Sequence, residues 1–497
     1  MVFGNWFATR KVRHGATAGV VVLATGGLFL LHANAATQGN VGTGYDVPSP
    51  VAVGNVFATP PLPVAGPDTV TFSGPHVRGT MAVSGAHALA GDGQPLYADI
   101  TLTPDASAGE HAPLALVIVL DTSGSMEGEK LREAKSAAKE LIRNMRDDDE
   151  VAFVHYASEA EVVQPLARVG AVRELLASRI EGLSASGGTA IPLGLAAGVN
   201  ALQSGLLRSE RGTDGRVKRV VLVSDGLDSS RPRSEFLAQD SAEKGITVSS
   251  MGIGVDFDEA YMGGVARSGH GNFGFVNDGP TLTAFLQREL VETATTVAQS
   301  TTVHLHMPEG VRFVKATGAS ADVHGRDVDL KVGALYADTA KRVLVQMTTD
   351  LAAGKTADFS GSLTWKTVGG GGAEATIPQL EVLASADAND VARNRNETVF
   401  ARVTSVEASE RQVEAAQAYA DGNQQRANDL IQTNVRMLKK AAMAAPAPAA
   451  SALSAQSLSY ESTMASFGSS APSSTSGKIA AKHAAASNMA NSNKSAF

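Results

Sequence analysis

Unbroken runs of apolar residues alternate with helical periodicity between residues 112 and 297. Four apolar runs, at 114–120, 150–158, 219–226 and 246–254, have the length of strands. Between the first two runs, apolar residues recur at helical spacing: Leu131, Ala134, Ala138, Leu141 and Met145. Strands that are apolar along their whole length are typical of a parallel sheet covered by helices on both faces. The pattern therefore predicts an α/β domain with a doubly wound, mainly parallel sheet over residues 112–297.

The segments on both sides of this domain have the pattern of short strands. Residues 68–108 include the alternating sequence LYADITLTP, and residues 299–384 contain several such alternations separated by turn residues. We expect an antiparallel β-sandwich over residues 299–384. We also expect the strands of 68–108 to belong to it, so that the α/β domain is inserted into one sandwich.

The C-terminal part of the chain divides into a periodic and a low-complexity segment. Helical periodicity returns over residues 390–442 and is interrupted by DGN at 421–423, which predicts a helical hairpin. Residues 443–497 are mostly Ala, Ser and Pro, with few large apolar side chains. Because such a segment buries little apolar surface to offset its ordering entropy, we expect a disordered tail.

The N-terminus has the features of an export signal. Basic residues at 10, 11 and 13 precede an apolar run at 16–31, and Ala-Asn-Ala at 33–35 supplies the small residues that a signal peptidase accepts. An uncleaved membrane anchor is the alternative for residues 1–35, although the run is shorter than the roughly 20 residues of a full span. In both cases we expect the remainder to be exported: periplasmic, at the cell surface or secreted. Residues 36–67, rich in Pro and Gly, are predicted to form a linker.

Composition excludes some classes of function. The chain has 497 residues, of which 43% are hydrophobic, enough for several folded domains. Its formal net charge of −8 argues against a general nucleic-acid binder, which needs a basic surface. The chain has no cysteine, so it forms no disulfide, no thiolate metal site and no cysteine-linked lipid anchor.

Side chains that carry oxygen follow two of the predicted strands. Asp121, Ser123 and Ser125 come directly after the first strand, Asp225 follows the third, and Thr189 lies in a glycine-rich loop before a helix. Ligands of an open parallel sheet bind at the carboxyl ends of its strands, so we expect these five residues to meet at one edge. An all-oxygen set favours Mg²⁺, with Ca²⁺ or Mn²⁺ as alternatives. A cation held by few carboxylates also leaves a position for a carboxylate from another molecule.

The three parts of this set resemble a known family of domains. The sequences DTSGSM (121–126), GGT (187–189) and SDG (224–226) are similar, in the same order, to the metal-ion-dependent adhesion site of von Willebrand factor type A domains. The resemblance covers about residues 112–297. It implies that Ser123, Ser125 and Thr189 bind the cation through hydroxyls, and that Asp121 and Asp225 act directly or through water. The flanking strands resemble exported bacterial members in which a β domain follows.

An enzymatic function has weaker support in the sequence, and we expect no catalytic residues. Aspartyl-phosphate phosphatases carry a second acid two residues after the first, where this chain has Ser123. The P-loop pattern G-x-x-x-x-G-K-[ST] does not occur, and GLSAS at 182–186 lacks the second glycine of a nucleophile elbow. The predicted function is cation-dependent binding of a protein that presents an Asp or Glu carboxylate. The alternative is an envelope scaffold in which the metal only stabilises the domain, and a metal-dependent hydrolase is the third possibility.

Three further groups of residues allow a metal or a purely structural interpretation. His304 and His306 lie two apart on one predicted strand and could form half of a metal site, but no third ligand is evident in the sequence, so an exposed strand face is the favoured interpretation. The acidic run at 147–150 could bind Ca²⁺, although a solvated turn before a strand is the favoured interpretation. Asp256 and Asp258 are expected to cap the helix that follows them.

Overall fold

The computed structural model describes residues 66–105, 112–208, 216–225 and 228–496 of the chain. The export signal or anchor predicted for residues 1–35 lies outside the described residues, as does nearly all of the linker predicted for 36–67. Within the described part of the chain, no helix combines the length and the apolar run needed to cross a membrane.

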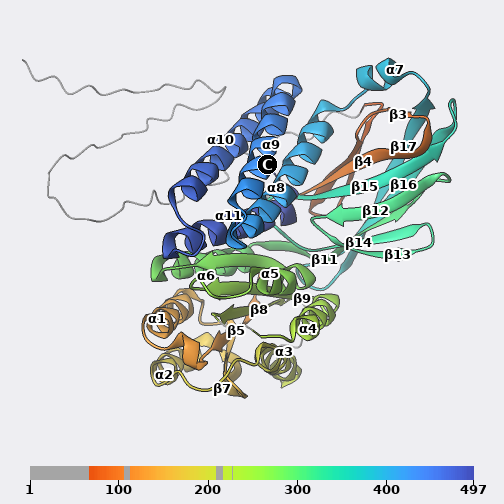
Figure 1. The fold of residues 1–497 in the computed structure, drawn as a ribbon. Helices are drawn as coiled ribbons and strands as arrows, with labels where there is room; N and C mark the ends of the chain where they lie inside the picture. Colours follow the sequence, from red (N-terminus) through yellow and green to blue (C-terminus); the bar gives the residue numbers. More distant parts are fainter. Residues whose placement is uncertain (1–65, 106–111, 209–215, 226–227, 497) are drawn as a thin grey trace, which may run out of the picture. The chain divides into compact units, whose positions relative to one another are not determined.

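A six-stranded sheet forms the centre of the α/β domain (Figure 1). Its strand order is β10-β9-β8-β5-β6-β7, and all neighbours are parallel except β6 and β7. The chain enters at the middle strand β5 and then builds the sheet outward on both sides, which confirms the predicted doubly wound, mainly parallel sheet. The strands are β5 (Leu114–Asp121), β6 (Glu150–Tyr156), β7 (Ala160–Arg168), β8 (Val217–Ser224), β9 (Ile246–Ile253) and β10 (His270–Val276).

Helices cover both faces of this sheet. One buried cluster joins the sheet to α1 (Glu129–Asn144), α2 (Val169–Glu181) and α6 (Gly279–Ala294). A second cluster joins the opposite face to α3 (Ile191–Arg208), α4 (Arg231–Glu243) and α5 (Glu259–Ser268). Side chains of β5 alternate between the two clusters, and every residue of β5 and β9 is buried. The unbroken apolar runs of the sequence therefore reflect strands that contact helices on both sides.

Two further sheets pack face to face as a sandwich. One has the order β1-β2-β4-β15-β12 and the other β13-β14-β11-β16-β17-β3. Both are antiparallel apart from the short parallel pair of β17 and β3. The strands are β1 (Thr69–Gly74), β2 (Val77–Val83), β3 (His87–Leu89), β4 (Gly91–Pro104), β11 (Thr296–His306), β12 (Val311–Thr317), β13 (Ser320–His324), β14 (Asp327–Tyr336), β15 (Lys341–Leu351), β16 (Thr356–Thr367) and β17 (Gly372–Ser385).

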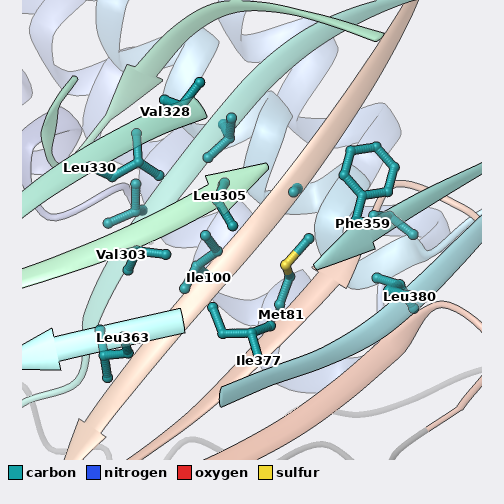
Figure 2. Close-up of a cluster of buried hydrophobic side chains, with 14 of the residues drawn as sticks. Met81, Ile100, Val303, Leu305, Val328, Leu330, Phe359, Leu363, Ile377 and Leu380 are labelled. Carbon is teal, nitrogen blue, oxygen red and sulfur yellow. The ribbon is translucent and has the colours of Figure 1, made fainter. Parts of the chain in front are cut away.

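Strands from both sides of the α/β domain pair within this sandwich. Strand β4 pairs with β15 along most of its length, and β3 pairs with β17. The α/β domain follows β4 and precedes β11 in the sequence, so it is inserted between two strands of the sandwich. Figure 2 shows the interior, where Met81 and Ile100 of the first sheet lie among the apolar side chains of the second, such as Leu305 and Phe359.

The C-terminal region is helical almost to its end, in contrast to the predicted tail. The expected hairpin over 390–442 contains α8 (Glu397–Ala420) and α9 (Gln424–Ala444), preceded by α7 (Ala388–Arg393). The prediction of disorder for 443–497 is wrong, because α10 (Ala447–Ser469) and α11 (Thr475–Asn493) occupy most of this segment. Alanine has the highest helix propensity and permits close packing of helices. The prediction of disorder counted large apolar side chains and took neither effect into account.

The large side chains of α10 explain how so few apolar residues suffice. Leu453, Tyr460 and Phe467 recur every seven residues, a spacing that places them on one face of the helix, and all three are buried. The ring of Phe467 stacks on that of Tyr419 from α8, with ring centroids 3.9 Å apart. The Tyr460 hydroxyl donates to Asn488 Oδ1 of α11 at 2.6 Å. A narrow stripe of aromatic and aliphatic anchors therefore stabilises this bundle.

Candidate metal centre

Asp121 and Asp225 lie at the carboxyl ends of neighbouring strands. Asp121 is the last residue of β5, and Asp225 follows Ser224, the last residue of β8. Strands β5 and β8 are parallel and in register, with Leu120 opposite Val223. The Ser224 hydroxyl donates to Asp121 Oδ2 at 2.6 Å. The two acidic residues are therefore brought to one edge of the sheet, at the point between β5 and β8 where the strand order reverses, as the sequence predicts.

The two serines connect these carboxylates. The backbone N–H of Ser123 donates to Asp121 Oδ1 at 2.8 Å. The hydroxyls of Ser123 and Ser125 are 3.0 Å apart, and Ser125 Oγ donates to Asp225 Oδ1 at 2.7 Å. Four of the five predicted residues thus form one continuous hydrogen-bonded chain, and Ser125 is the exposed member of the four.

Thr189, the fifth residue, lies in a loop that backbone hydrogen bonds hold beside the other four residues. The Gly-rich loop that contains it contacts the segment after β5, because Gly124 N–H donates to the Gly187 carbonyl at 3.0 Å and Ser186 N–H to the Thr122 carbonyl at 2.9 Å. Gly187 has φ of 76°, a conformation that favours glycine. Thr189 is half-buried, and within the described residues its hydroxyl makes no hydrogen bond to the other four. The loop is docked at the site, while the Thr189 side chain remains separate from the hydrogen-bonded chain.

Two further charged residues complete the site, and neither was singled out in the sequence. The Lys130 ammonium, in the first turn of α1, forms an ion pair with Asp225 and donates to the Ser125 carbonyl at 3.2 Å. Asp228 accepts a hydrogen bond from Ile191 N–H at 2.9 Å, which joins the segment after β8 to the start of α3. The only sequence feature that could have pointed to these two residues is their position, a few residues after Ser125 and Asp225.

Burial controls the electrostatics of the site. It raises the pKa of Asp121 and outweighs the hydrogen bonds from Ser123 and Ser224, which lower it; the neighbouring Asp225 raises this pKa further. Tyr156 OH lies 3.4 Å from Asp121 Oδ2, and burial raises the pKa of that phenol as well. Two buried carboxylates at one sheet edge require positive charge nearby.

The donor atoms fit a hard divalent cation. The five predicted residues offer carboxylate and hydroxyl oxygens, and neither imidazole nor thiolate accompanies them. In the described ranges, no group of three or more His, Cys, Asp or Glu side chains is arranged to hold a metal ion. A site here therefore depends on the serine and threonine hydroxyls beside two acids, a set compatible with Mg²⁺, Mn²⁺ or Ca²⁺.

The two histidines of β11 are each engaged by an aspartate. His304 Nδ1 lies 2.7 Å from Asp329 Oδ1, and His306 Nδ1 lies 2.7 Å from Asp327 Oδ1, both on the neighbouring strand β14. The other ring nitrogen of His304 contacts Thr364 Oγ1 at 2.9 Å. These contacts indicate that the two histidines stabilise the pairing of β11 with β14.

The acidic segments also have structural partners. Asp147 pairs with Arg173 at 2.6 Å, and Asp149 accepts a hydrogen bond from the Arg146 N–H at 2.9 Å. Asp258 caps α5 by accepting from Tyr261 N–H at 3.0 Å, as expected, whereas Asp256 pairs with Lys478 of α11 at 3.2 Å. The acidic run before β6 is thus held by arginine and backbone contacts.

Comparison with known proteins agrees with the fold of the α/β domain. Residues 115–288 match the family model of the von Willebrand factor type A domain. The chain is 31% identical over 180 residues to an uncharacterised protein of Synechocystis sp., which is 35% of this chain and 40% of that protein. It is 28% identical over 204 residues to the uncharacterised protein YfbK of Escherichia coli, which is 40% of this chain and 34% of that protein. The alignments therefore span less than half of either relative.

A solved structure extends the similarity of fold beyond the α/β domain. A von Willebrand factor type A protein from Catenulispora acidiphila superposes with a TM-score of 0.61 at 19% identity and covers 81% of this chain and 89% of its own. At this identity the likeness concerns the fold alone. Together with the family match and the strand order of the sheet, it leads to one conclusion. The chain contains a von Willebrand factor type A domain, formed by residues 115–288.

Proposed function

We propose that this protein is an exported, divalent-cation-dependent binding module for other proteins. Von Willebrand factor type A domains commonly mediate protein–protein interaction. The observation that carries the proposal is the hydrogen-bonded chain from Asp121 through Ser123 and Ser125 to Asp225, with the Thr189 loop docked beside it. A carboxylate of an Asp or Glu side chain on the partner would complete the coordination of the cation.

Each residue has a distinct role in this proposal. The hydroxyls of Ser123, Ser125 and Thr189 would bind the cation, preferably Mg²⁺, and Asp121 and Asp225 would balance its charge directly or through water. The bound cation supplies an electropositive centre for an anionic ligand. Ser125 is exposed, so the site opens to solvent on the side where a partner could approach. Asp121, Ser123 and Asp225 are buried, so Ser125 is the hydroxyl nearest to solvent among these four residues.

The proposed location rests on the N-terminal sequence. The basic residues, the apolar run and the small residues of 1–35 support export to the periplasm, the cell surface or the medium, with a cleaved signal or a retained anchor. A binding module outside the cytoplasm would meet partners on the envelope or beyond it.

A catalytic function is less well supported by the side chains around the site. The hydroxyl–imidazole pair nearest the site is Thr122 with His155, whose Oγ1 and Nδ1 are 2.9 Å apart. Thr122 is only 1% exposed, and its hydroxyl lies 3.1 Å from the Tyr156 carbonyl as a donor. A nucleophile must reach its substrate, so this pair does not fit acyl transfer. We therefore propose a binding protein and not an enzyme.

Calorimetric titration of the full chain with Mg²⁺, Mn²⁺ and Ca²⁺ tests the metal site. We expect one ion to bind, and a double variant, Ser123→Ala with Ser125→Ala, to lose about tenfold to a hundredfold in affinity or more. The double variant should keep the circular dichroism of the parent. Equal affinity of the two proteins would refute the site.

Partner capture with and without chelator then separates binding from a scaffold function. A partner that is retained with Mg²⁺ and released by chelator supports the adhesion proposal. If the metal raises the melting temperature but leaves partner capture unchanged, the protein is a scaffold stabilised by its cation.

A further inference from the structure

The ammonium of Lys130 occupies the position in which positive charge is needed at the metal centre. Lys130 lies in the first turn of α1, directly after the segment that carries Ser123 and Ser125. Its Nζ pairs with Asp225 Oδ2 and also donates to the Ser125 carbonyl at 3.2 Å. The other oxygen of Asp225, Oδ1, accepts the Ser125 hydroxyl at 2.7 Å. Both oxygens of this carboxylate are therefore engaged, one by a hydroxyl and one by a cation.

The burial of the pair is unequal. The Asp225 side chain is 0% exposed, whereas the Lys130 side chain is 32% exposed. A fully buried carboxylate needs a counter-charge, and this one is supplied by a flexible side chain that reaches in from solvent. The ammonium can leave the site and be hydrated, while the carboxylate cannot.

The neighbouring loop leaves space for this side chain. Gly254 follows β9 and has φ of 78°. A Cβ atom at this position would lie 3.0 Å from Lys130 Cε and 3.4 Å from its Nζ. A larger residue at 254 would therefore crowd the lysine in the position that pairs with Asp225.

We propose that Lys130 is a tethered cation that competes with the divalent cation at this site. The inference rests on the proposed metal-dependent function and adds a determinant of metal affinity to it. A divalent cation beside Asp225 must either displace the ammonium or accept its repulsion, and both lower the affinity. Metal binding raises the net charge of the two carboxylates and the ammonium from −1 to 0 if the ammonium is displaced, or to +1 if it stays, and either change favours an anionic ligand. Metal and partner carboxylate therefore bind in a coupled manner.

The matched experiment compares Lys130→Met with Lys135→Met in the full chain. Lys135 lies on the same helix, and its Nζ donates to the Glu181 carbonyl at 2.7 Å, away from the site, so the control removes the same charge. In titration with Mg²⁺ after treatment with chelator, we expect the dissociation constant of Lys130→Met to fall at least about tenfold and that of Lys135→Met to stay unchanged.

Thermal unfolding gives a second readout. In chelator, Lys130→Met leaves the Asp225 carboxylate without its counter-ion, so its melting temperature should fall below that of the parent. Addition of Mg²⁺ should then raise the melting temperature more in the variant than in the parent. If Lys130→Met does not fold without metal, Lys130→Gln, which keeps a donor group of similar length, replaces it in both measurements.

The outcomes separate this inference from the proposed function. If the parent and Lys130→Met bind Mg²⁺ equally, or the variant binds more weakly, Lys130 does not compete and only this inference fails. If only the variant binds Mg²⁺, the competition is stronger than we expect and the inference holds. If neither folded protein binds Mg²⁺, Mn²⁺ or Ca²⁺, the metal-dependent function fails and the inference fails with it.

Discussion

The two ends of strand β8 carry ionic clusters of opposite design. At the carboxyl end, Asp225 meets Lys130 and the exposed Ser125, so the cluster opens to solvent. At the amino end, Arg219 pairs with Glu289 at 2.7 Å, and these two side chains are 1% and 0% exposed. The first cluster is held by a flexible lysine and hydroxyls that an ion can recruit, whereas the second is closed. The open cluster is the end that we propose for binding, whereas the contacts of the closed cluster are structural.

The closed cluster joins the α/β domain to the sandwich. Arg219 donates to the Tyr336 hydroxyl of β14, and Asn272 of β10 donates to Glu289 Oε1 at 2.7 Å and to Glu292 Oε2 at 2.5 Å. An arginine suits this role because its planar group makes several directed hydrogen bonds at once. The candidate metal centre and the contact with the sandwich thus lie at opposite ends of the same strand.

Removal of the arginine should have the largest effect on stability. Arg219→Met leaves Glu289 buried without a counter-charge, and we expect the free energy of unfolding to fall by about 3–5 kcal/mol. Urea denaturation measures this change. The double variant with Glu289→Gln removes the unpaired charge and should recover part of the loss; an equal loss in both variants would contradict the electrostatic explanation.

Loss of the hydroxyl at Tyr336 should have a smaller effect in the same direction. Tyr336→Phe keeps the ring near Arg219 but removes an acceptor for its guanidinium, which corresponds to about 1.5–3 kcal/mol for a hydrogen bond to a charged group. Urea denaturation compares this variant with the parent at pH 7. An unchanged midpoint would mean that the contact between the domain and the sandwich contributes little.

Acid should weaken the same end of the domain through His270 at the start of β10. Burial is the main cause that lowers the pKa of His270 to about 4; Lys341 and Lys331 contribute in the same direction, and Glu243 opposes them. The unfolded chain therefore binds more protons than the folded one between pH 6.5 and about 4, so stability falls as pH decreases through this range. We expect a loss of about 1–2 kcal/mol between pH 7 and 5.

Asparagine is the matched replacement for this test. His270 has φ of 54°, a conformation that Asn tolerates better than most residues. His270→Asn should reduce the difference in unfolding free energy between pH 7 and pH 5 relative to the parent. An identical pH dependence in both proteins would assign the acid sensitivity to other groups.

Ser125→Ala at the open end should have the smallest effect on stability. Ser125 is exposed, so we expect a change below about 1 kcal/mol in urea denaturation, together with weaker Mg²⁺ binding. A large loss of stability without a loss of metal affinity would make the two ends of β8 equivalent and remove the contrast between them.

The sequence located the residues that meet at this edge of the sheet better than it located their charged neighbours. Asp121, Ser123, Ser125 and Asp225 could be found because each follows a strand in a short motif, and the carboxyl ends of parallel strands meet at one edge. Lys130 could not be found in this way, because it lies in the first turn of α1 and belongs to none of these motifs. Its role depends on where α1 begins relative to β8.

For the C-terminal helices, the prediction from the sequence was wrong although part of the signal was present. Composition over residues 443–497 indicated disorder, yet the seven-residue spacing of Leu453, Tyr460 and Phe467 was already present in the sequence. These side chains stabilise the helix only when other helices pack against them. Their partners Tyr419 and Asn488 lie on α8 and α11. A helix with one narrow apolar stripe is stabilised mainly by tertiary packing.

Local patterns in the sequence determined the alternation of strands and helices in the α/β domain and indicated the oxygen-bearing side chains of its candidate metal centre. The elements follow from residues close together in the chain, and each candidate ligand follows from its own short motif, although the three motifs lie far apart in the sequence. The tertiary structure alone decided which flanking strands pair, that α10 and α11 are ordered, and that an ammonium lies on the Asp225 carboxylate. Each of these depends on contacts between distant segments, whose free energy arises only when the chain has folded.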